Sequence, residues 1–332
     1  MADDLPTAAE AEPQARSARP PQFRREKREV NGWLILDKPV GMTSTHAVAV
    51  IKRVFSAKKA GHAGTLDPLA SGVLPIALGE ATKTVSFVME GRKAYRFTVR
   101  WGIETDTDDA EGSAIATSQA RPDETAIRAM LSRFTGAIMQ TPPKFSAIKI
   151  AGERAYDLAR EGEDVTLEPR PVEIDRLDLV AIVDADHAEF EAECGKGTYV
   201  RALARDLGRA LGTCGHVCAL RRSMVGPFRE AAAIGLDALQ AAAQPDGASA
   251  GPASLLLPVE AGVQDLPALA VSRADAARLA RGQPVLLRGR DAPIIEGWAA
   301  VSTGGTLMAL VEAANGELQP RRVFNLGAAA PR

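Results

Sequence analysis

The sequence predicts an α+β fold with a small, strand-rich module at its C-terminal end. Strand-like and helix-like stretches are interleaved along the 332 residues, without the strict strand–helix–strand rhythm of a doubly wound sheet. A hydrophobic fraction of 46% allows a sizeable core, and this length favours one large domain plus a smaller one. We therefore expect a leader over residues 1–30, a main domain over 31–262 and a C-terminal module over 265–327.

The N-terminal part begins without apolar periodicity. Residues 1–30 are rich in Ala, Pro, Arg and Glu, which predicts a disordered leader. A short buried strand is expected over 33–36, followed by a helix that Ser44 or Thr45 caps. The apolar residues of this helix recur with helical spacing: Ala47, Ile51, Val54 and Phe55.

The middle of the chain carries further strand and helix signals. Residues 94–101 alternate as a half-buried strand does, and a helix is expected to start near Asp123. Strands follow over 178–183 and 188–194, and a helix over 200–211. The face of the alternating strand that we expect to be buried comprises Tyr95, Phe97, Val99 and Trp101.

The C-terminal module is predicted from local signals. Ser272 with Asp275 resembles a capping box, and Gly282 ends the short helix that follows. Strand-like runs come next, with the pair Asn315 and Gly316 as a strong hairpin signal.

Charge is nearly balanced at −2, but it is unevenly distributed. Residues 196–229 hold seven basic side chains and one acid, a net charge of 7 − 1 = +6, and Lys52, Arg53, Lys58 and Lys59 form a second basic group. Such blocks are typical of proteins that neutralise phosphates, although a solvated helix face has the same pattern.

The cysteines indicate neither a disulfide framework nor a metal site. Three thiols are an odd number in a long chain, and Cys214, His216 and Cys218 lack the paired spacing of zinc ligands. No signal peptide or membrane-spanning apolar run is present, so a cytoplasmic protein is expected.

The segment GHAGTLDPLASG, residues 61–72, is a candidate site because it places His62 and Asp67 among small residues. Gly61, Gly64 and Gly72 would let the backbone approach a ligand closely. An Asp before Pro is also a common turn. Nearby GEATKT lacks the frame of a phosphate-binding loop, and no G-x-S-x-G elbow supports a Ser/His/Asp triad.

Several longer motifs follow one another in the order and spacing of a known family. They are GWLILDKPVGMTS, AGHAGTLDPLASGVLPIALGEATK, KAYRF, FSAIKIAGERAYDLAR, GKGTYVRALARDLG and HVCALRR. Over residues 32–326 the chain resembles the TruB-type tRNA pseudouridine synthases of bacteria. The resemblance implies the pseudouridine synthase catalytic fold, a mixed and largely antiparallel sheet flanked by helices, followed by a PUA-like β-barrel that binds RNA. It also implies isomerisation of uridine 55 in the tRNA T-loop by base flipping.

The resemblance assigns the catalytic roles. Asp67 is implied to be the carboxylate that lets uracil leave its sugar, rotate and rejoin through C5, and a carboxylate can stabilise or trap an oxocarbenium-like sugar. Arg201 matches the arginine that pairs with this aspartate, and Tyr95 matches the tyrosine that stacks on the uracil. The family needs no metal or organic cofactor. Attack at the sugar and attack at the base both stay open.

Other residues are implied to contact the substrate. Tyr199 resembles a second active-site aromatic residue, and Leu220 resembles an apolar wall of the base pocket; by pattern both would be core residues. Lys38 either orients the active-site loops, reaches a phosphate or lies exposed in a turn. Gly61 and Thr65 belong to the same motif as Asp67 and are expected at the substrate.

The helix over 200–211 carries Arg201, Arg205 and Arg209 at i, i+4 and i+8, which also describes an exposed basic stripe. The resemblance assigns Arg201 to the site and leaves Arg205 and Arg209 as phosphate contacts. His62 is implied to fill the space of the flipped base by stacking, with a structural histidine as the alternative.

The segment 122–154 resembles a flexible insertion that closes over the T-loop, where Lys144, Lys149 and Arg154 would meet phosphates. The expected partner is the T-stem-loop of tRNA, no association with a membrane is expected, and the expected oligomeric state is a monomer. The competing interpretation is an RNA chaperone of the same fold that helps tRNA fold by binding alone. Asp67, Tyr95 and Arg201 favour the enzyme, because binding alone has no use for that carboxylate.

Overall fold

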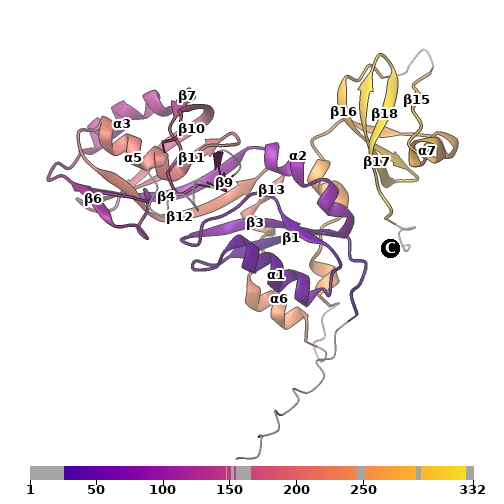
Figure 1. The fold of residues 1–332 in the computed structure, drawn as a ribbon, viewed down its shortest axis with the longest axis horizontal. Coiled ribbons are helices and arrows are strands. Elements are labelled where there is room, and N and C mark those ends of the chain that lie inside the picture. The colour runs from indigo at the N-terminus through magenta and orange to yellow at the C-terminus, as the bar shows by residue number, and fades with distance from the viewer. Residues whose placement is uncertain are drawn as a thin grey trace, which may run out of the picture.

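A nine-stranded sheet forms the body of the main domain in the computed structural model (Figure 1). The structure describes residues 26–146, 148–150, 153–154, 166–244, 251–288 and 293–326. The strands of this sheet are β1 Gly32–Lys38, β2 Ala60–His62, β3 Ala70–Leu78, β4 Lys93–Trp101, β7 Gly136–Gln140, β10 Arg170–Ile182, β11 His187–Cys194, β12 Gly215–Val225 and β13 Phe228–Arg229.

The sheet is mixed and largely antiparallel. Its strands follow the order β1, β3, β12, β4, β11, β10, β7, while β2 pairs with β3 and β13 with β12. The contact between β3 and β12 is parallel, and the other pairings in the sheet are antiparallel. The α+β prediction is therefore confirmed, and the one parallel contact joins two distant segments that both reach the candidate site.

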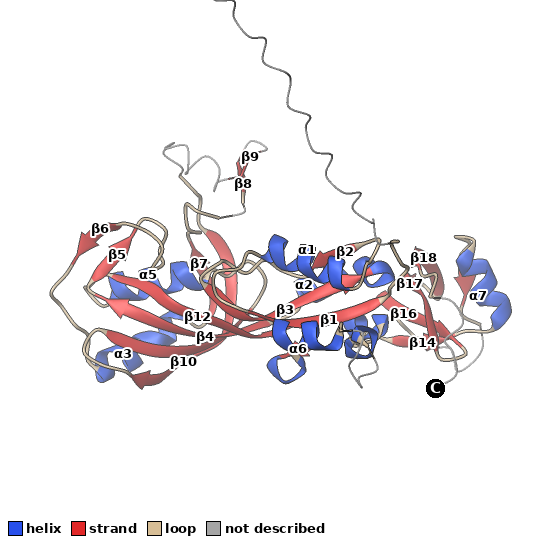
Figure 2. Cartoon of the chain, turned by 90° about the horizontal axis from the view of Figure 1, so that it is seen from below, coloured by secondary structure: helices blue, strands red, loops and turns tan. Residues whose placement is uncertain are grey.

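Helices cover the sheet and connect its strands (Figure 2). Helix α5 packs against β12 and β4, α3 against β10, and α1 against β2 and β3. The helices of the described main domain are α1 Ser44–Val54, α2 Val85–Glu90, α3 Glu124–Leu131, α5 Val200–Ala210 and α6 Leu236–Ala242, with 3-10 turns η1 Gly79–Lys83, η2 Ser132–Phe134, η3 Glu230–Ala232, η4 Pro252–Leu255 and η5 Val259–Val263. Two short strand pairings lie outside this sheet: β5 Ile103–Thr105 pairs with β6 Ala114–Thr117, and β8 Lys149–Ile150 pairs with β9 Glu153–Arg154.

Strand alternation and helix caps explain the local structure. In β4, Phe97, Val99 and Trp101 are buried while Arg96 and Arg100 are exposed, as the alternation predicts. In β1 both faces are buried, because helices cover one face and the connection to the C-terminal module covers the other.

The cap of α1 differs from the prediction. Thr43, rather than Ser44 or Thr45, accepts the hydrogen bond from the His46 amide, at 3.1 Å. Ser44 is unavailable because its hydroxyl bonds the backbone of Leu66 in the candidate site.

The predicted insertion over 122–154 begins inside the body of the domain. Asp123 caps α3, Ile127 is fully buried, and β7 pairs with β10. The chain leaves the sheet only after Gln140. The side chains of Lys149 and Arg154 and residues 1–25 of the leader lie outside the described part.

The C-terminal module is a curled sheet with one helix. Its elements are β14 Ala268–Ala270, α7 Arg273–Ala280, β15 Val285–Leu286, β16 Gly297–Thr303, β17 Thr306–Ala314 and β18 Glu317–Val323, and the strands follow the order β14, β16, β17, β18, β15. Ser272 caps α7 as predicted. Asn315 and Gly316 form the hairpin turn with φ of 51° and 75°, the left-handed conformation that these two residue types accommodate.

The module rests on η1 and α2 of the main domain. Arg322 donates to the Lys83 carbonyl at 2.6 Å, and Lys83 donates to the Val323 carbonyl at 2.8 Å. The rings of Phe87 and Trp298 meet edge to face at 5.0 Å. These contacts fix the module at one end of the sheet, away from β7 (Figure 1). None of the helices in the described ranges is long and apolar enough to cross a bilayer.

Candidate active site

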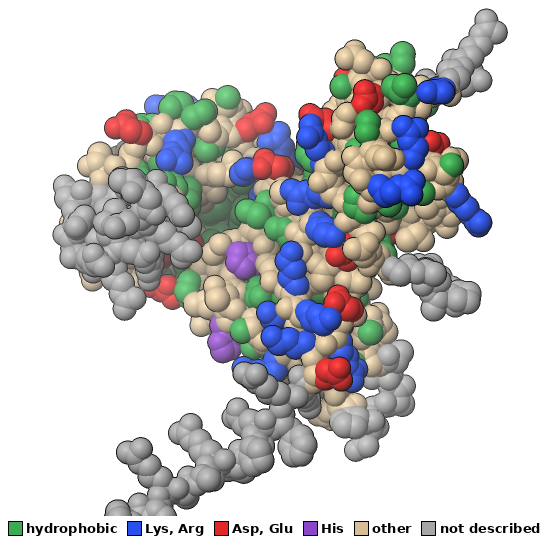
Figure 3. Space-filling model, turned by 45° about the vertical axis from the view of Figure 1, so that its right-hand side comes forward, with side chains coloured by type: hydrophobic (Ala, Val, Ile, Leu, Met, Phe, Trp, Pro, Cys, Tyr) green, Lys and Arg blue, Asp and Glu red, His purple; other side chains and the backbone are tan. Residues whose placement is uncertain are grey.

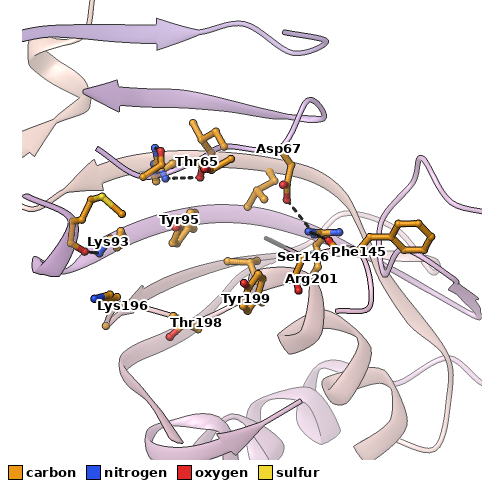
Figure 4. Close-up of a pocket in the computed structure, with 18 residues that line it drawn as sticks. Thr65, Asp67, Lys93, Tyr95, Phe145, Ser146, Lys196, Thr198, Tyr199 and Arg201 are labelled. Carbon is orange, nitrogen blue, oxygen red and sulfur yellow. Dashed lines mark hydrogen bonds and ion pairs between the residues drawn. The ribbon is translucent and has the colours of Figure 1, made fainter. Parts of the chain in front are cut away.

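A cavity of about 430 Å³ opens between the segment after β2 and the N-terminus of α5 (Figure 4). It brings together six of the residues that the sequence singled out, and Asp67 points across it toward Arg201. These six are Thr65, Asp67, Tyr95, Tyr199, Arg201 and Leu220. Gly61, His62 and Lys38 do not line it.

Asp67 and Arg201 form an ion pair, with 3.1 Å between Oδ2 and Nε. The Arg201 side chain is 7% exposed and that of Asp67 is 37% exposed, so the carboxylate reaches solvent while its partner does not. The remaining guanidinium nitrogens donate to Thr107 O at 3.0 Å, Asp109 Oδ2 at 3.3 Å and Phe145 O at 2.9 Å. Arg201 is therefore fixed from four sides, and it presents one edge to Asp67.

The backbone around Asp67 is tightly held. The Ser44 hydroxyl accepts from the Leu66 amide at 2.8 Å and donates to the Leu66 carbonyl at 2.9 Å. The Gly41 amide donates to the Pro68 carbonyl at 2.7 Å. A segment that reads as a flexible loop is thus anchored to the start of α1 on both sides of the aspartate.

Lys38 anchors the same segment. It is fully buried, and its ammonium donates to Pro39 O and Met42 O at 2.8 Å each and to Pro68 O at 3.5 Å. Burial lowers the pKa of Lys38 to about 8. All three donors of the ammonium are used on the protein backbone, so the contacts support the loop-orienting alternative for Lys38 over an exposed turn lysine or a phosphate contact.

Arg222 of β12 lies behind the segment that carries Asp67, and the sequence did not predict a role for it. It is 2% exposed and donates to the carbonyls of Val73, Thr65 and Gly64 at 2.9, 3.2 and 3.0 Å. Its neighbour in the parallel pairing is Gly72, with φ of +98°. A Cβ at that glycine would lie 2.2 Å from the Arg222 carbonyl oxygen, so the close approach of β3 and β12 requires glycine there.

Two tyrosines form the aromatic walls of the cavity. Tyr95 projects from β4, and burial raises the pKa of its hydroxyl. Tyr199 stands at the N-terminus of α5, where Gln140 bonds its backbone on both sides: the Tyr199 amide donates to Gln140 Oε1 at 2.8 Å, and Gln140 Nε2 donates to Tyr199 O at 3.1 Å. Gln140 is 2% exposed at the end of an edge strand, a buried amide that no sequence signal singled out.

Lys93 is a further cavity residue that the sequence analysis did not identify as functional. It is 8% exposed, and its ammonium donates to the carbonyls of Met89 and Gly91. Burial lowers its pKa to about 8. Its place in the KAYRF motif, two residues before Tyr95, was the available signal.

His62 lies on β2, beside the cavity rather than in its wall. Burial, with a smaller contribution from Arg222, lowers the pKa of its imidazole. Its Nδ1 is buried without a hydrogen-bond partner among the described residues.

Lys and Arg side chains are spread over the face of the molecule in Figure 3, from the main domain to the C-terminal module.

Arg205 of the α5 stripe is buried, which corrects its expected phosphate contact, whereas the Arg209 side chain is 57% exposed. Arg205 is 7% exposed and pairs with Asp108 at 2.7 Å, and Arg209 pairs with Glu104 at 2.5 Å. Asp108 has φ of +61°, and burial raises its pKa to about 6. A row of acids on β5 and the following loop thus neutralises the stripe, so the +6 count overstates the positive charge that α5 offers to a phosphate.

The motifs that were set aside carry no competing site. Cys214 and Cys218 are free thiols, and the His216 ring bonds the Ile103 carbonyl at 2.8 Å. No cluster of three or more His, Cys, Asp or Glu side chains in the described ranges could hold a metal ion. GEATKT forms the 3-10 turn η1 rather than a phosphate-binding loop.

Comparison with known proteins identifies the family. Residues 52–200 match the family model of the TruB family pseudouridylate synthase N-terminal domain, and residues 201–264 match the tRNA pseudouridylate synthase B C-terminal domain. A protein named tRNA pseudouridine synthase B from Bradyrhizobium diazoefficiens is 65% identical over 324 residues, with 97% of this chain and 93% of the relative covered. The chain belongs to the TruB family of pseudouridylate synthases. A relative of the same name from Rhodopseudomonas palustris is 67% identical over 306 residues, covering 91% of this chain and 83% of the relative.

Two solved structures contain chains with a similar fold. A Cbf5-Nop10-Gar1 complex contains a chain that matches with a TM-score of 0.70 and 28% identity, covering 88% of this chain and 84% of that one. An H/ACA RNP bound to a substrate RNA containing 2′-deoxyuridine contains a chain that matches with a TM-score of 0.70 and 27% identity, covering 89% and 85%.

Proposed function

We propose that this chain isomerises uridine 55 to pseudouridine in the T-loop of tRNA. The observation that carries the proposal is the partly exposed carboxylate of Asp67, aimed across a base-sized cavity at the buried Arg201, 3.1 Å away. The tRNA substrate is supported by the names of the relatives. The choice of uridine 55 rests on the resemblance of the motifs.

In the proposed reaction the N1–C1′ bond of uridine breaks and a C5–C1′ bond forms. The proton on C5 is lost and N1 gains a proton, so the reaction needs no redox partner. Asp67 either traps the oxocarbenium-like sugar at C1′ or adds to the base before rotation. Arg201 holds the carboxylate in position in both routes.

A uridine must leave its stack to reach Asp67. Extrusion costs a few kcal/mol of lost stacking, which contacts to the flipped base must offset. Tyr95 and Tyr199 offer aromatic faces for the uracil, and Leu220 offers an apolar wall. His62 stacks in the vacated space; its lowered pKa favours the neutral ring at physiological pH, consistent with stacking.

The remaining expectations belong to the same proposal. The module over 265–327 acts as a PUA-like RNA-binding domain, the main domain spans 31–262, and Lys144 approaches RNA phosphates. Gly61 and Thr65 lie close to the substrate backbone. The chain works as a cytoplasmic monomer without a metal or organic cofactor.

The experiment measures tritium release from a T-stem-loop RNA that contains 5-³H-uridine. Wild type should release label from one uridine, and Asp67→Asn, which keeps the side-chain shape, should release none while still binding the RNA. The matched control is Asp237→Asn, an exposed aspartate of α6 in the main domain, which should keep wild-type activity.

Replacing uridine 55 by cytidine in the RNA should abolish release and tests the position. Release from another uridine would contradict the choice of position 55. Binding of the RNA without release by wild type would favour the chaperone alternative over the enzyme.

A further inference from the structure

Arg222 is a buried cation in the wall of the active-site cavity. It lies on β12 behind the Asp67 segment, is 2% exposed, and lines the cavity with Tyr95 and Asp67. Its Nε and both terminal nitrogens donate to three backbone carbonyls, two of them at Gly64 and Thr65. The guanidinium is thus held in one position by the same segment that presents Asp67.

The charge of Arg222 has no carboxylate partner in direct contact within the described ranges. Four other arginines of α5 and β12 do have one: Arg201, Arg205, Arg209 and Arg221 each form an ion pair. Burying an unpaired cation is costly, and carbonyl dipoles compensate only part of that cost. A site that keeps such a charge has it available for a negative charge that forms later.

Tyr95 is the polar side chain through which Arg222 meets the cavity. Both side chains line the cavity, and the Arg222 cation acts on the Tyr95 hydroxyl: it opposes the effect of burial on the Tyr95 pKa. Cys194 and Asp67 are the other titratable groups that act on this hydroxyl. The cation, the hydroxyl and the Asp67 segment therefore form one connected unit.

The proposed chemistry creates the negative charge that this unit would stabilise. If the N1–C1′ bond breaks first, the bonding electrons stay on uracil and the detached base is an anion. If the carboxylate adds to the base first, negative charge spreads over the pyrimidine ring and its oxygen. Both routes therefore place negative charge on the base that Tyr95 faces.

We propose that Arg222 is a positioning residue that supplies the fixed positive charge opposite the uracil ring and orients the Tyr95 hydroxyl toward it. The inference rests on the proposed function. Fixed charges in a site from which water is excluded act on a transition state without reorganisation, and removing one such group typically lowers the rate ~10²–10³-fold.

The test compares Arg222→Met, which removes the charge, with Arg222→Lys, which keeps it without the planar fork. Arg221→Met is the matched control, since Arg221 is the next residue of the same strand and its side chain is partly exposed. Single-turnover tritium release and T-stem-loop binding are measured for each. Arg222→Met should lower the release rate ~10²–10³-fold and leave the RNA dissociation constant within about threefold. Arg222→Lys should recover part of the rate, and Arg221→Met should match wild type.

A second readout does not depend on activity. The chain has three tyrosines, so 3-fluorotyrosine labelling gives three ¹⁹F resonances, and Tyr95→Phe identifies the one of interest. Fluorine withdraws electrons from the ring and lowers the phenol pKa, so the titration of each labelled tyrosine lies at lower pH than that of the unlabelled residue. In Arg222→Met the Tyr95 midpoint should move up, with Arg222→Lys between the two, while the Tyr199 midpoint stays unchanged.

An unchanged Tyr95 midpoint together with a release rate within threefold of wild type would overturn the proposal. If Arg222→Met does not fold, Arg222→Gln takes its place in the same two readouts, because glutamine is neutral yet can still donate to a backbone carbonyl. An unchanged Tyr95 midpoint and a release rate within threefold of wild type in that variant would overturn the proposal. A wild-type protein that makes no pseudouridine refutes the proposed function instead, and the ¹⁹F titration still tests the link between Arg222 and Tyr95.

Discussion

The carboxylate of Asp67 and the Nε of Arg201 lie 3.1 Å apart, although Asp67 follows β2 and Arg201 lies in the first turn of α5. The pair is asymmetric: the arginine is buried and bonded to three other oxygens, while the aspartate faces the cavity. The guanidinium is therefore held in place by the protein, and the carboxylate beside it is the partner that a substrate can reach.

Replacing Arg201 should affect both stability and rate. Arg201→Met leaves the buried Asp109 carboxylate without its cation, and breaking a buried pair in this way costs about 3–5 kcal/mol. We expect a similar loss in the free energy of unfolding in urea and a fall in single-turnover tritium release of at least ~10²-fold. Arg201→Lys should recover less than half of the stability, because one ammonium cannot reach all four acceptors. Full activity in Arg201→Met would contradict the role given to the ion pair.

Arg205 should matter for stability but not for RNA binding. Arg205→Met leaves the buried Asp108 carboxylate without its cation and should lower the free energy of unfolding by about 3–5 kcal/mol. In the control Arg128→Met, the protein loses only a surface ion pair with Glu124, so the free energy of unfolding should change by less than about 1 kcal/mol. Burial raises the pKa of Asp108 to about 6 even beside Arg205, and the loss of that cation raises it further. The cost of Arg205→Met should therefore shrink as the pH falls toward 6 and the carboxyl of the variant is neutralised. Urea unfolding at pH 5 and pH 8 checks this.

The salt dependence of RNA binding separates the two interpretations of Arg205. A phosphate contact would contribute to the slope of log K against log salt concentration. Since the guanidinium is occupied inside the protein, Arg205→Met should leave this slope unchanged. A shallower slope in the folded variant would restore Arg205 as a phosphate contact.

Substitution by alanine should destabilise the protein strongly at Gly72 and hardly at all at Gly61. At Gly72 the positive φ and the carbonyl 2.2 Å from a new Cβ force β3 and β12 apart, so Gly72→Ala should lose more than about 2 kcal/mol of unfolding free energy. At Gly61 no atom lies within 4 Å of the added methyl, so Gly61→Ala should change it by less than about 0.5 kcal/mol. Chemical denaturation of both variants tests the contrast, and equal losses would contradict the close approach at Gly72.

Lys38 should make stability depend on pH in the alkaline range. Its pKa falls from 10.5 to about 8 on folding, so between these values the unfolded chain binds more protons than the folded one. Stability from this group therefore rises with pH, by up to about 3 kcal/mol across the window. Lys38→Met has no such group. The unfolding free energy of wild type minus that of Lys38→Met should therefore rise from pH 7 to pH 10, and a constant value would contradict the lowered pKa of the buried lysine.

Local structure was largely determined by the sequence alone. The alternation around Phe97 sets the two faces of β4, Asp123 and Ser272 cap their helices, and Asn315 with Gly316 closes the hairpin. Each of these signals acts between residues a few positions apart, where the geometry of one strand, helix or turn is enough. The motif around Asp67 likewise indicated the family and the segment that carries the carboxylate.

The partners of charged side chains were decided by the tertiary structure. The i, i+4, i+8 spacing puts Arg201, Arg205 and Arg209 on one face of a helix but does not reveal that Glu104, Asp108 and Asp109 lie opposite. Lys38 and Arg222 are buried because the pairing of β3 with β1 and β12 encloses them, a long-range arrangement with no local signature. The charge of a side chain follows from its residue type, whereas its environment depends on strands and loops that come from elsewhere in the chain. The candidate site could therefore be located from the sequence, but the ion pairs and pKa values within it could not be predicted.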